Sequence, residues 1–392
     1  MDASFFIAGR LRFKGKIAVT SIAVSFLVMI IAVAVSAGFR HEVRNGLSEL
    51  SGDIRLMPPT MNILDENDPI ESNPAYLPHV AQIESVKSIE PAVYRAGIIK
   101  NGENIHGVLF KGVQGGVSEV PDSVSLAVSI PSRLAEITGL KPGDRMLSYF
   151  VGDKVKARQF NVVSVHQTMI QADEKLVVYA DLADMQRING WDENQVSVME
   201  VMLDDEFKDE AEIEEIAGHA GVLVNAYSSD DEASVISVSA VSSYPQLFDW
   251  LNLIDFNVFF ILILMTIVAG FNMISGLLIM LFENISTIGL LKSLGMTDRA
   301  ISKVFLSSSA VLVLKGMAYG NLIAILFCFI QGTTHLLRLN PENYFVSFVP
   351  VSLDLGMVAL ADLVSFAVIM LLLLIPCVFI SKVDPAETVR MK

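Results

Sequence analysis

The residues of this chain best suited to act on another molecule lie in the segment 283–295, between two long apolar runs. The candidate coupling residues there are Glu283, Ile285, Ile288, Gly289, Leu291, Lys292 and Gly295. The apolar members recur at helical spacing, and Gly295 stands where a left-handed residue commonly ends a helix. Such a surface binds a partner by burying apolar side chains and pairing charges, without covalent chemistry. The segment is predicted to be a short amphipathic helix that is free to dock against another protein.

Residues that could support catalysis or bind a metal do not form a recognisable set. We find no serine nucleophile elbow and no paired catalytic carboxylates, and the six histidines lack metal-ligand spacing. Cys328 and Cys377 both lie inside apolar runs, which argues against a disulfide framework. The segment 9–16 resembles a phosphate-binding loop, but five residues separate its glycines and Ile17 follows its lysine. The sequence therefore predicts no catalytic site, no metal site and no ATP-binding motif.

The composition indicates a membrane protein. Hydrophobic residues make up 52% of the 392 residues and charged residues only 18%, which is too apolar for a water-soluble protein of this length. The apolar surplus is concentrated in the segments 17–39, 256–282, 304–330 and 355–380. Each exceeds the ~20 residues that a helix needs to cross a bilayer, so four spans are predicted. A cleaved signal peptide is the alternative for the first segment, although its apolar run is too long for one.

Basic residues near the ends of the spans set the predicted orientation. They precede the first span, lie between the second and third, and follow the fourth, which places those segments in the cytoplasm. Arg40 and Arg44, just after the first span, argue weakly the other way. The predicted order begins with a cytoplasmic N-terminus at 1–16, a first span at 17–39 and an extracytoplasmic domain with stalk helices at 40–255. A second span at 256–282 and a third at 304–330 follow, joined by a cytoplasmic loop at 283–303. A short outer loop at 331–354 leads to the fourth span at 355–380 and a cytoplasmic tail at 381–392.

The segment between the first two spans is predicted to be an α+β domain on helical stalks. Apolar residues keep helical spacing over 39–50 after the first span and over 247–254 before the second. Strands are predicted at 145–151, 160–166, 176–180, 196–203 and 222–227, and a helix at 132–138. The acidic run 204–215 is predicted to be a solvated helix face, with an interaction patch as the alternative. Acidic residues concentrated in this domain account for the net charge of −15 and argue against nucleic acid as a partner.

Two charged residues lie inside predicted spans. Lys315 is near the middle of the third span, and Asp362 lies toward the outer end of the fourth. A charge in hydrocarbon is costly and is usually paired or faces a cavity, so these two residues are candidates for an ion pair. In the alternative interpretation, Lys315 extends toward the lipid headgroups and Asp362 meets water at an interface between subunits.

Several motifs resemble the FtsX/MacB superfamily of ABC transporter permeases. The loop pattern is carried by Glu283, the run 288–292, Leu294 and Gly295, and the tail by 384–387 with Arg390. The segments 36–43 and 268–275 resemble the lipoprotein-releasing LolC/LolE type within that superfamily. One departure is Thr287, where the superfamily usually has an acidic residue.

The resemblance implies a MacB-like periplasmic domain and a permease of the bacterial inner membrane. It implies two permeases, a homodimer or a related pair, above a separate cytoplasmic ATPase that holds ATP and Mg²⁺, with no cofactor and no enzymatic activity on this chain. The transported molecule would be a lipoprotein, passed to a periplasmic carrier by mechanical transmission. Its acyl chains would lie between the first two spans of facing subunits, near Val33, Ala37, Phe256, Phe259 and Phe260; plain lipid contact is the alternative for these aromatic residues.

Three other functions remain open on the sequence. A MacB-like efflux permease shares the topology but typically carries its ATPase on the same chain. An FtsX-like regulator of cell-wall hydrolases typically has a much smaller outer domain. A membrane-anchored sensor would need a cytoplasmic signalling domain, and the predicted cytoplasmic segments here are short.

Overall fold

The computed structural model describes residues 16–64, 68–101, 104–115, 126–152, 154–166, 176–205, 209–340, 344 and 346–381. Contacts divide the chain into two compact units. The first, which we name the helical unit, comprises 1–41, 250–338 and 348–392, and the second, the sheet unit, comprises 42–249 and 339–347. The predicted cytoplasmic N-terminus up to residue 15 and the tail from 382, with its 384–390 motif, lie outside the described residues.

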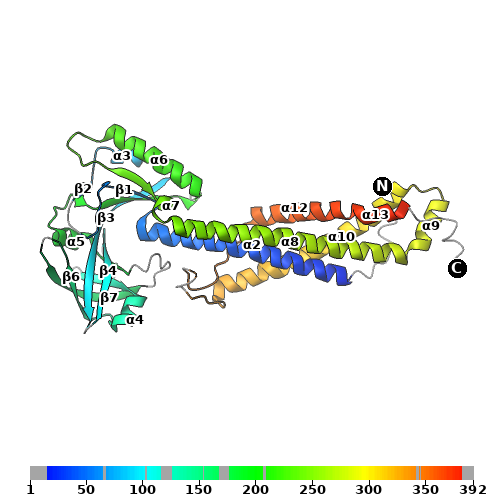
Figure 1. Cartoon of the computed structure of the whole chain (residues 1–392), viewed down its shortest axis with the longest axis horizontal. Helices are drawn as coiled ribbons and strands as arrows, with labels where there is room; N and C mark the ends of the chain where they lie inside the picture. The colour runs from blue at the N-terminus through cyan, green and yellow to red at the C-terminus, as the bar shows by residue number, and fades with distance from the viewer. Residues whose placement is uncertain are drawn as a thin grey trace. The chain divides into compact units, whose positions relative to one another are not determined.

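The described residues contain four helices long and apolar enough to cross a membrane (Figure 1). They are α2 (Lys16–Ser51), α8 (Pro245–Glu283), α10 (Asp298–Thr334) and the pair α12 (Leu355–Leu372) and α13 (Leu374–Ser381). Pro376 accounts for the break between α12 and α13, because its ring lacks an N–H and clashes with the carbonyl four residues earlier. The helices α2 and α8 each continue well beyond the predicted spans at 17–39 and 256–282. That these extensions act as stalks stays a prediction.

Glycines allow close packing in the helical unit. A Cβ built on Gly320 of α10 would lie 2.5 Å from the Ala23 carbonyl oxygen of α2, and one on Gly316 would lie 2.6 Å from the Ile22 side chain. Since real Cβ atoms do not approach so closely, these two helices depend on glycine at both positions. The buried core beside this contact includes Ile22, Phe26, Ala269, Met273, Leu277, Ile288, Ile301, Phe305, Val313 and Ile369.

The sheet unit is a mixed structure whose strands pair across long sequence distances. Its strands are β1 (Ile54–Met57), β2 (Ile70–Glu71), β3 (Val86–Asn101), β4 (Asn104–Val113), β5 (Ala127–Pro131), β6 (Arg145–Phe150), β7 (Lys156–His166), β8 (Val177–Asp181), β9 (Gln195–Val196), β10 (Val198–Leu203) and β11 (Ile236–Ser239). Its helices are α3 (Leu77–Val80), α4 (Ser132–Thr138), α5 (Leu182–Asn189), α6 (Glu210–Tyr227) and α7 (Ala240–Ser243). The main sheet has the order β11-β1-β10-β3-β4-β8-β5-β7-β6, and β2 pairs with β9.

The long strand β3 closes part of this sheet on itself. Its end pairs with β6 through Ile98↔Tyr149 and Ile99↔Ser148, so the strands β3, β4, β8, β5, β7 and β6 form a ring. Phe110, Phe150 and Phe160 fill the ring, with centroids 4.9–6.1 Å apart. Gly97 makes room for them, because a Cβ at that position would lie 2.7 Å from the Phe110 ring.

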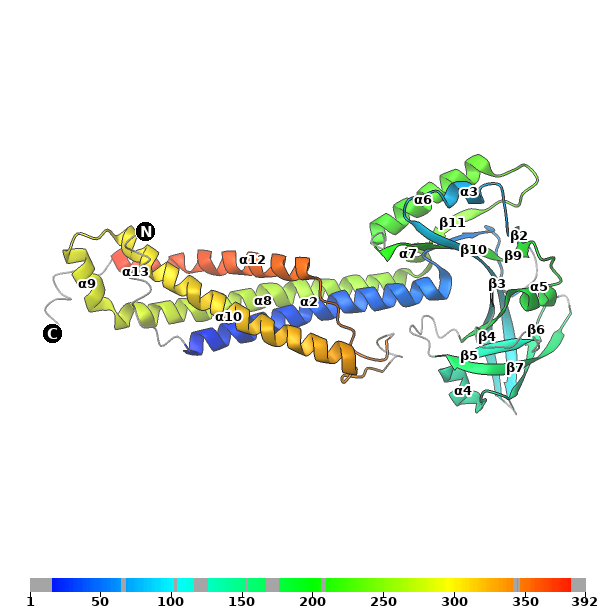
Figure 2. The same ribbon diagram turned by 180° about the vertical axis from the view of Figure 1, so that it is seen from behind.

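The first half of β3 instead joins the strands β10, β1 and β11, where α6 packs against β11 beside α3 (Figure 2). The strand predicted at 222–227 is wrong: these residues are the last turns of α6. Ile213, Ala217, Ala220 and Val224 are buried at helical spacing along this helix. The local preference of Val222 and Val224 for strand yields to the packing of a longer amphipathic helix.

Most of the other local predictions are confirmed, although the helix expected at 204–215 begins only at Glu210, as the start of α6. The strands expected at 145–151, 160–166, 176–180 and 196–203 correspond to β6, β7, β8 and β9 with β10. The helix expected at 132–138 is α4, and Gly139 follows it in the left-handed conformation with φ of 72°. These elements were predictable because their signals are local: alternating apolar residues for the strands, and a glycine for the end of the helix.

Candidate functional site

The segment predicted to couple the chain to a partner contains a separate helix, α9 (Ile285–Ser293), between α8 and α10. Gly295 has φ of 87°, and its N–H donates to the Lys292 carbonyl at 3.0 Å. The Met296 N–H donates to the Leu291 carbonyl, also at 3.0 Å. This pair of bonds is a Schellman motif, which satisfies carbonyls at the helix end and requires a left-handed residue. The predicted role of Gly295 in ending the helix is confirmed.

The prediction that the apolar stripe of α9 is free to dock is wrong for its central residues. Ile288 is only 1% exposed and belongs to the core of the helical unit, while Leu291 packs against that core. Gly289 is also buried, and Ile285 is half-buried. The stripe faces inward because the ends of α8, α10 and α13 supply an apolar surface for it, a partner that the local sequence does not identify. The exposed apolar residues are Leu294, the last member of the predicted stripe, at 75%, and Leu290, which was not part of it, at 55%.

The two charged residues of the segment have different surroundings. Glu283 ends α8 and is exposed. Asn284 is the N-cap residue of α9 without a capping side-chain bond; its amide donates back to the Met280 carbonyl at 2.9 Å. Lys292 forms an ion pair with Asp298 at 3.0 Å, and Asp298 begins α10, where the helix dipole favours a negative charge. Lys292 therefore fixes α9 to α10, whereas Glu283 faces outward.

The residues expected near acyl chains differ in their exposure within the described part of the chain. Phe256, Phe259 and Phe260 are 55–57% exposed on α8, and their neighbouring rings lie 4.8 and 6.4 Å apart. Val33 on α2 is buried, and Ala37 is half-buried. The three aromatic side chains thus form an outward apolar face, which is available to lipid, to a second subunit or to a hydrocarbon chain.

Sequence reasoning missed a polar cluster beside this face. Arg40 of α2 forms an ion pair with Asp255 of α8, and Ser36 donates a hydrogen bond to the same carboxylate. Arg44 pairs with Asp209 at 3.1 Å, within the sheet unit. Arg40 and Arg44, the two arginines whose positions argue against the predicted orientation, therefore both have carboxylate partners. The sequence did contain a signal for the Arg40–Asp255 pair, because opposite charges stand at the outer ends of the apolar segments 17–39 and 256–282.

The two charged residues inside the apolar helices are not brought together as an ion pair in the described part of the chain. Asp362 of α12 is buried and accepts a hydrogen bond from the side chain of Asn321, which lies on α10. Lys315 is exposed on α10. A second polar contact, Thr266 to Ser365 at 3.1 Å, joins α8 to α12. Lys315 is exposed, as the alternative interpretation expects, but Asp362 is not in water as that interpretation also expects: it is buried between α10 and α12.

Comparisons with known proteins place these features in context. A family described as FtsX-like permease C-terminal matches residues 259–385. The LolC transmembrane protein of the lipoprotein-releasing system of Neisseria meningitidis is 22% identical over 97% of this chain and 95% of its own length. The corresponding LolE protein of Haemophilus influenzae is 22% identical over 95% of this chain and 93% of its own.

Two solved structures are similar to part of the chain. The periplasmic region of MacB from Actinobacillus actinomycetemcomitans covers 51% of this chain and 95% of its own, at 11% identity and a TM-score of 0.31. The extracellular domain of YknZ covers 47% of this chain and 99% of its own, at 14% identity and a TM-score of 0.29. The sequence of this chain is thus similar to the FtsX-like permease family at 259–385 and to lipoprotein-releasing transmembrane proteins along nearly its whole length.

Proposed function

We propose that this chain is the permease subunit of an ABC transporter that releases lipoproteins from the bacterial inner membrane. The observation that carries the proposal is the resemblance to a lipoprotein-releasing protein over 97% of the chain, which covers the helical unit and the sheet unit together. A permease positions and moves its substrate without covalent chemistry, which suits a chain whose sequence offers no catalytic set. ATP and Mg²⁺ would be bound by a separate cytoplasmic ATPase.

The coupling step is assigned to α9. Glu283, Leu290 and Leu294 form the exposed face on which the ATPase would bind. Ile288 and Leu291 attach the opposite face to the helical core. Because the Lys292–Asp298 ion pair also fixes α9 to α10, a push on α9 would move the long helices with it.

The substrate route is assigned to the outward face of α8. Acyl chains of the lipoprotein would lie against Phe256, Phe259 and Phe260, between this face and a second permease copy or a paralogue. Val33 and Ala37 of α2 would then pack behind this aromatic face of α8. The sheet unit would lie in the periplasm with the carrier, and both chain termini in the cytoplasm.

The test is purification of the complex from native membranes without added partners. An ATPase together with bound triacylated protein is the expected result, and ATP with a soluble carrier should then release that protein. A bound cell-wall hydrolase, or export of a small molecule without lipoprotein release, would contradict the proposal and support an FtsX-like or MacB-like function instead.

A further inference from the structure

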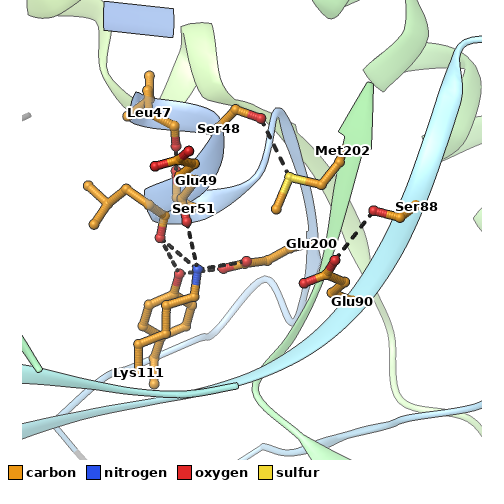
Figure 3. A network of polar contacts seen from close by, with 11 residues as sticks. Leu47, Ser48, Glu49, Ser51, Ser88, Glu90, Lys111, Glu200 and Met202 are labelled. Carbon is orange, nitrogen blue, oxygen red and sulfur yellow. Dashed lines mark hydrogen bonds and ion pairs between the residues drawn. The ribbon is translucent and has the colours of Figure 1, made fainter. Parts of the chain in front are cut away.

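A buried ion pair lies in the sheet unit at the end of α2 (Figure 3). The Lys111 ammonium on β4 is 2.8 Å from a Glu200 carboxylate oxygen on β10, and both side chains are only 2% exposed. The strand β3 lies between these two strands, so the pair reaches across it. Removing two charges from water is costly, and their mutual attraction often does no more than offset that cost. Stability alone is therefore a weak reason for this pair.

The ion pair also binds the C-terminal end of α2. The Lys111 Nζ also donates to the Leu50 carbonyl at 2.9 Å and to the Glu49 carbonyl at 3.3 Å. These are among the last carbonyls of α2, which ends at Ser51 and so cannot satisfy them within the helix. A cation at this position also complements the negative end of the helix dipole. Lys111 thus binds a carboxylate of the sheet and the terminus of the helix at the same time.

Tyr94 on β3 completes the cluster. Its hydroxyl lies 2.5 Å from the second Glu200 carboxylate oxygen and 3.1 Å from the Leu50 carbonyl. A hydroxyl has one proton, and the shorter contact assigns it to Glu200. Burial, followed by the charge of Glu200, raises the pKa of Tyr94 well above its usual value of 10, so this donor stays protonated at physiological pH. Glu200 therefore has a donor on each oxygen.

The chain beyond the helix is fixed to the same strand. Gly52 has φ of 72°, and its Cβ position would lie 3.0 Å from the Glu200 Cβ, so the chain turns directly against β10. Asp53 accepts hydrogen bonds from the Ser48 hydroxyl at 2.9 Å and from the Leu203 N–H at 2.8 Å. Gly52, which follows α2, thus lies directly against β10, and Asp53 links the last turn of α2 to the same strand through its hydrogen bonds.

We infer that Lys111, Glu200 and Tyr94 form the joint that transmits a displacement of α2 to the sheet unit. The inference rests on the proposed function, because it concerns how release is driven. The helix α2 is continuous from Lys16, in the helical unit, to Ser51, in the sheet unit. A charged cluster with fixed donor directions holds the helix end in one register, whereas an apolar contact at the same place would allow it to slide or rotate. These three are positioning residues for the release step.

The main variant is Lys111→Met combined with Glu200→Leu, which replaces the ion pair by apolar side chains of similar length. The control is Arg95→Met, which removes another buried cation, on β3, that donates to the Val151 carbonyl. In the reconstituted complex with its ATPase, the double variant should keep complex assembly, thermal melting and ATP hydrolysis. Its lipoprotein transfer to the carrier should fall at least about tenfold, as expected when one step of the release cycle loses its coupling.

A second measurement tests directly whether the cluster holds the end of α2 in one position. Spin labels at Glu49→Cys and Arg158→Cys, in a Cys328→Ser/Cys377→Ser background, report the distance between the helix end and the ring of strands. The unmodified cluster and Arg95→Met should each give one narrow distance distribution, and the double variant a broad one. Tyr94→Phe, which deletes only a hydroxyl, should broaden the distribution less and provides a variant with little effect on folding.

Unchanged transfer and an unchanged distance distribution in the double variant would overturn the inference. An equal loss of transfer in Arg95→Met would also overturn it, since any buried cation would then matter equally. If the wild-type complex itself transfers no lipoprotein, the proposed function fails, while the distance measurement still decides whether the cluster holds the helix end.

Discussion

Gly320→Ala tests the close contact between α10 and α2. The added Cβ would lie 2.5 Å from the Ala23 carbonyl oxygen and 2.9 Å from the Phe26 Cβ. The first of these is a backbone atom, so the overlap can be relieved only by moving one helix away from the other. Overpacking of this kind costs about 1–3 kcal/mol, whereas glycine to alanine in a helix gains about 1 kcal/mol from propensity.

A matched glycine separates these two effects. Gly276 of α8 also faces α2, but its Cβ would lie 3.5 Å from the Ala18 Cβ, an ordinary contact. Because the propensity gain is common to both substitutions, Gly320→Ala should be less stable than Gly276→Ala by about 1–3 kcal/mol. Gly316→Ala should likewise be less stable than Gly276→Ala, since its Cβ would lie 2.7 Å from the Ile22 Cβ, an atom that cannot move without the α2 backbone.

The assay is unfolding of the purified protein in mixed detergent micelles, followed by circular dichroism, with the free energy of unfolding compared among the three variants. Equal stability of Gly320→Ala and Gly276→Ala would refute the argument that the helix backbones are in contact at Gly320. Because α10 also holds α9, Gly320→Ala should reduce transport per ATP hydrolysed more than Gly276→Ala does.

Three further outcomes are expected. Ile288→Asp should lower the melting temperature of the whole protein because it buries a charge, whereas Leu290→Asp should preserve melting and weaken ATPase binding; equal melting of the two would place Ile288 on the surface. Arg40→Gln and Asp255→Asn should each cost about 0.5–1 kcal/mol, and the double variant no more than either, in a double-mutant cycle; additive losses would mean that the two do not interact. Burial lowers the pKa of His166 from 6.5 to about 4, so between these pH values the unfolded chain binds more protons than the folded chain. The free energy of unfolding should therefore fall as the pH drops from 6.5 toward 4. Urea unfolding measured across this range should show a smaller fall for His166→Gln.

The sequence alone determined the elements whose signals are local. Four apolar runs longer than a bilayer requires identify four long helices, because length and composition are sufficient for that prediction. The separate helix α9 and its end at Gly295 were equally predictable, since helical periodicity and a glycine that can adopt positive φ lie within a few residues of each other. Most strands of the sheet unit followed from alternation of apolar and polar residues in the same way.

The tertiary structure decided which side chains meet. Lys111 and Glu200 are 89 residues apart, and Asp362 and Asn321 are 41 apart, so nothing near either member identifies its partner. The stripe on α9 was correctly located in the sequence, yet whether it faces a partner protein or its own bundle depends on where the ends of α8, α10 and α13 lie. The residues 222–227 read as a strand locally and are helical because α6 buries them at helical spacing. Pairing and burial are properties of neighbours in space, and local sequence patterns constrain only neighbours along the chain.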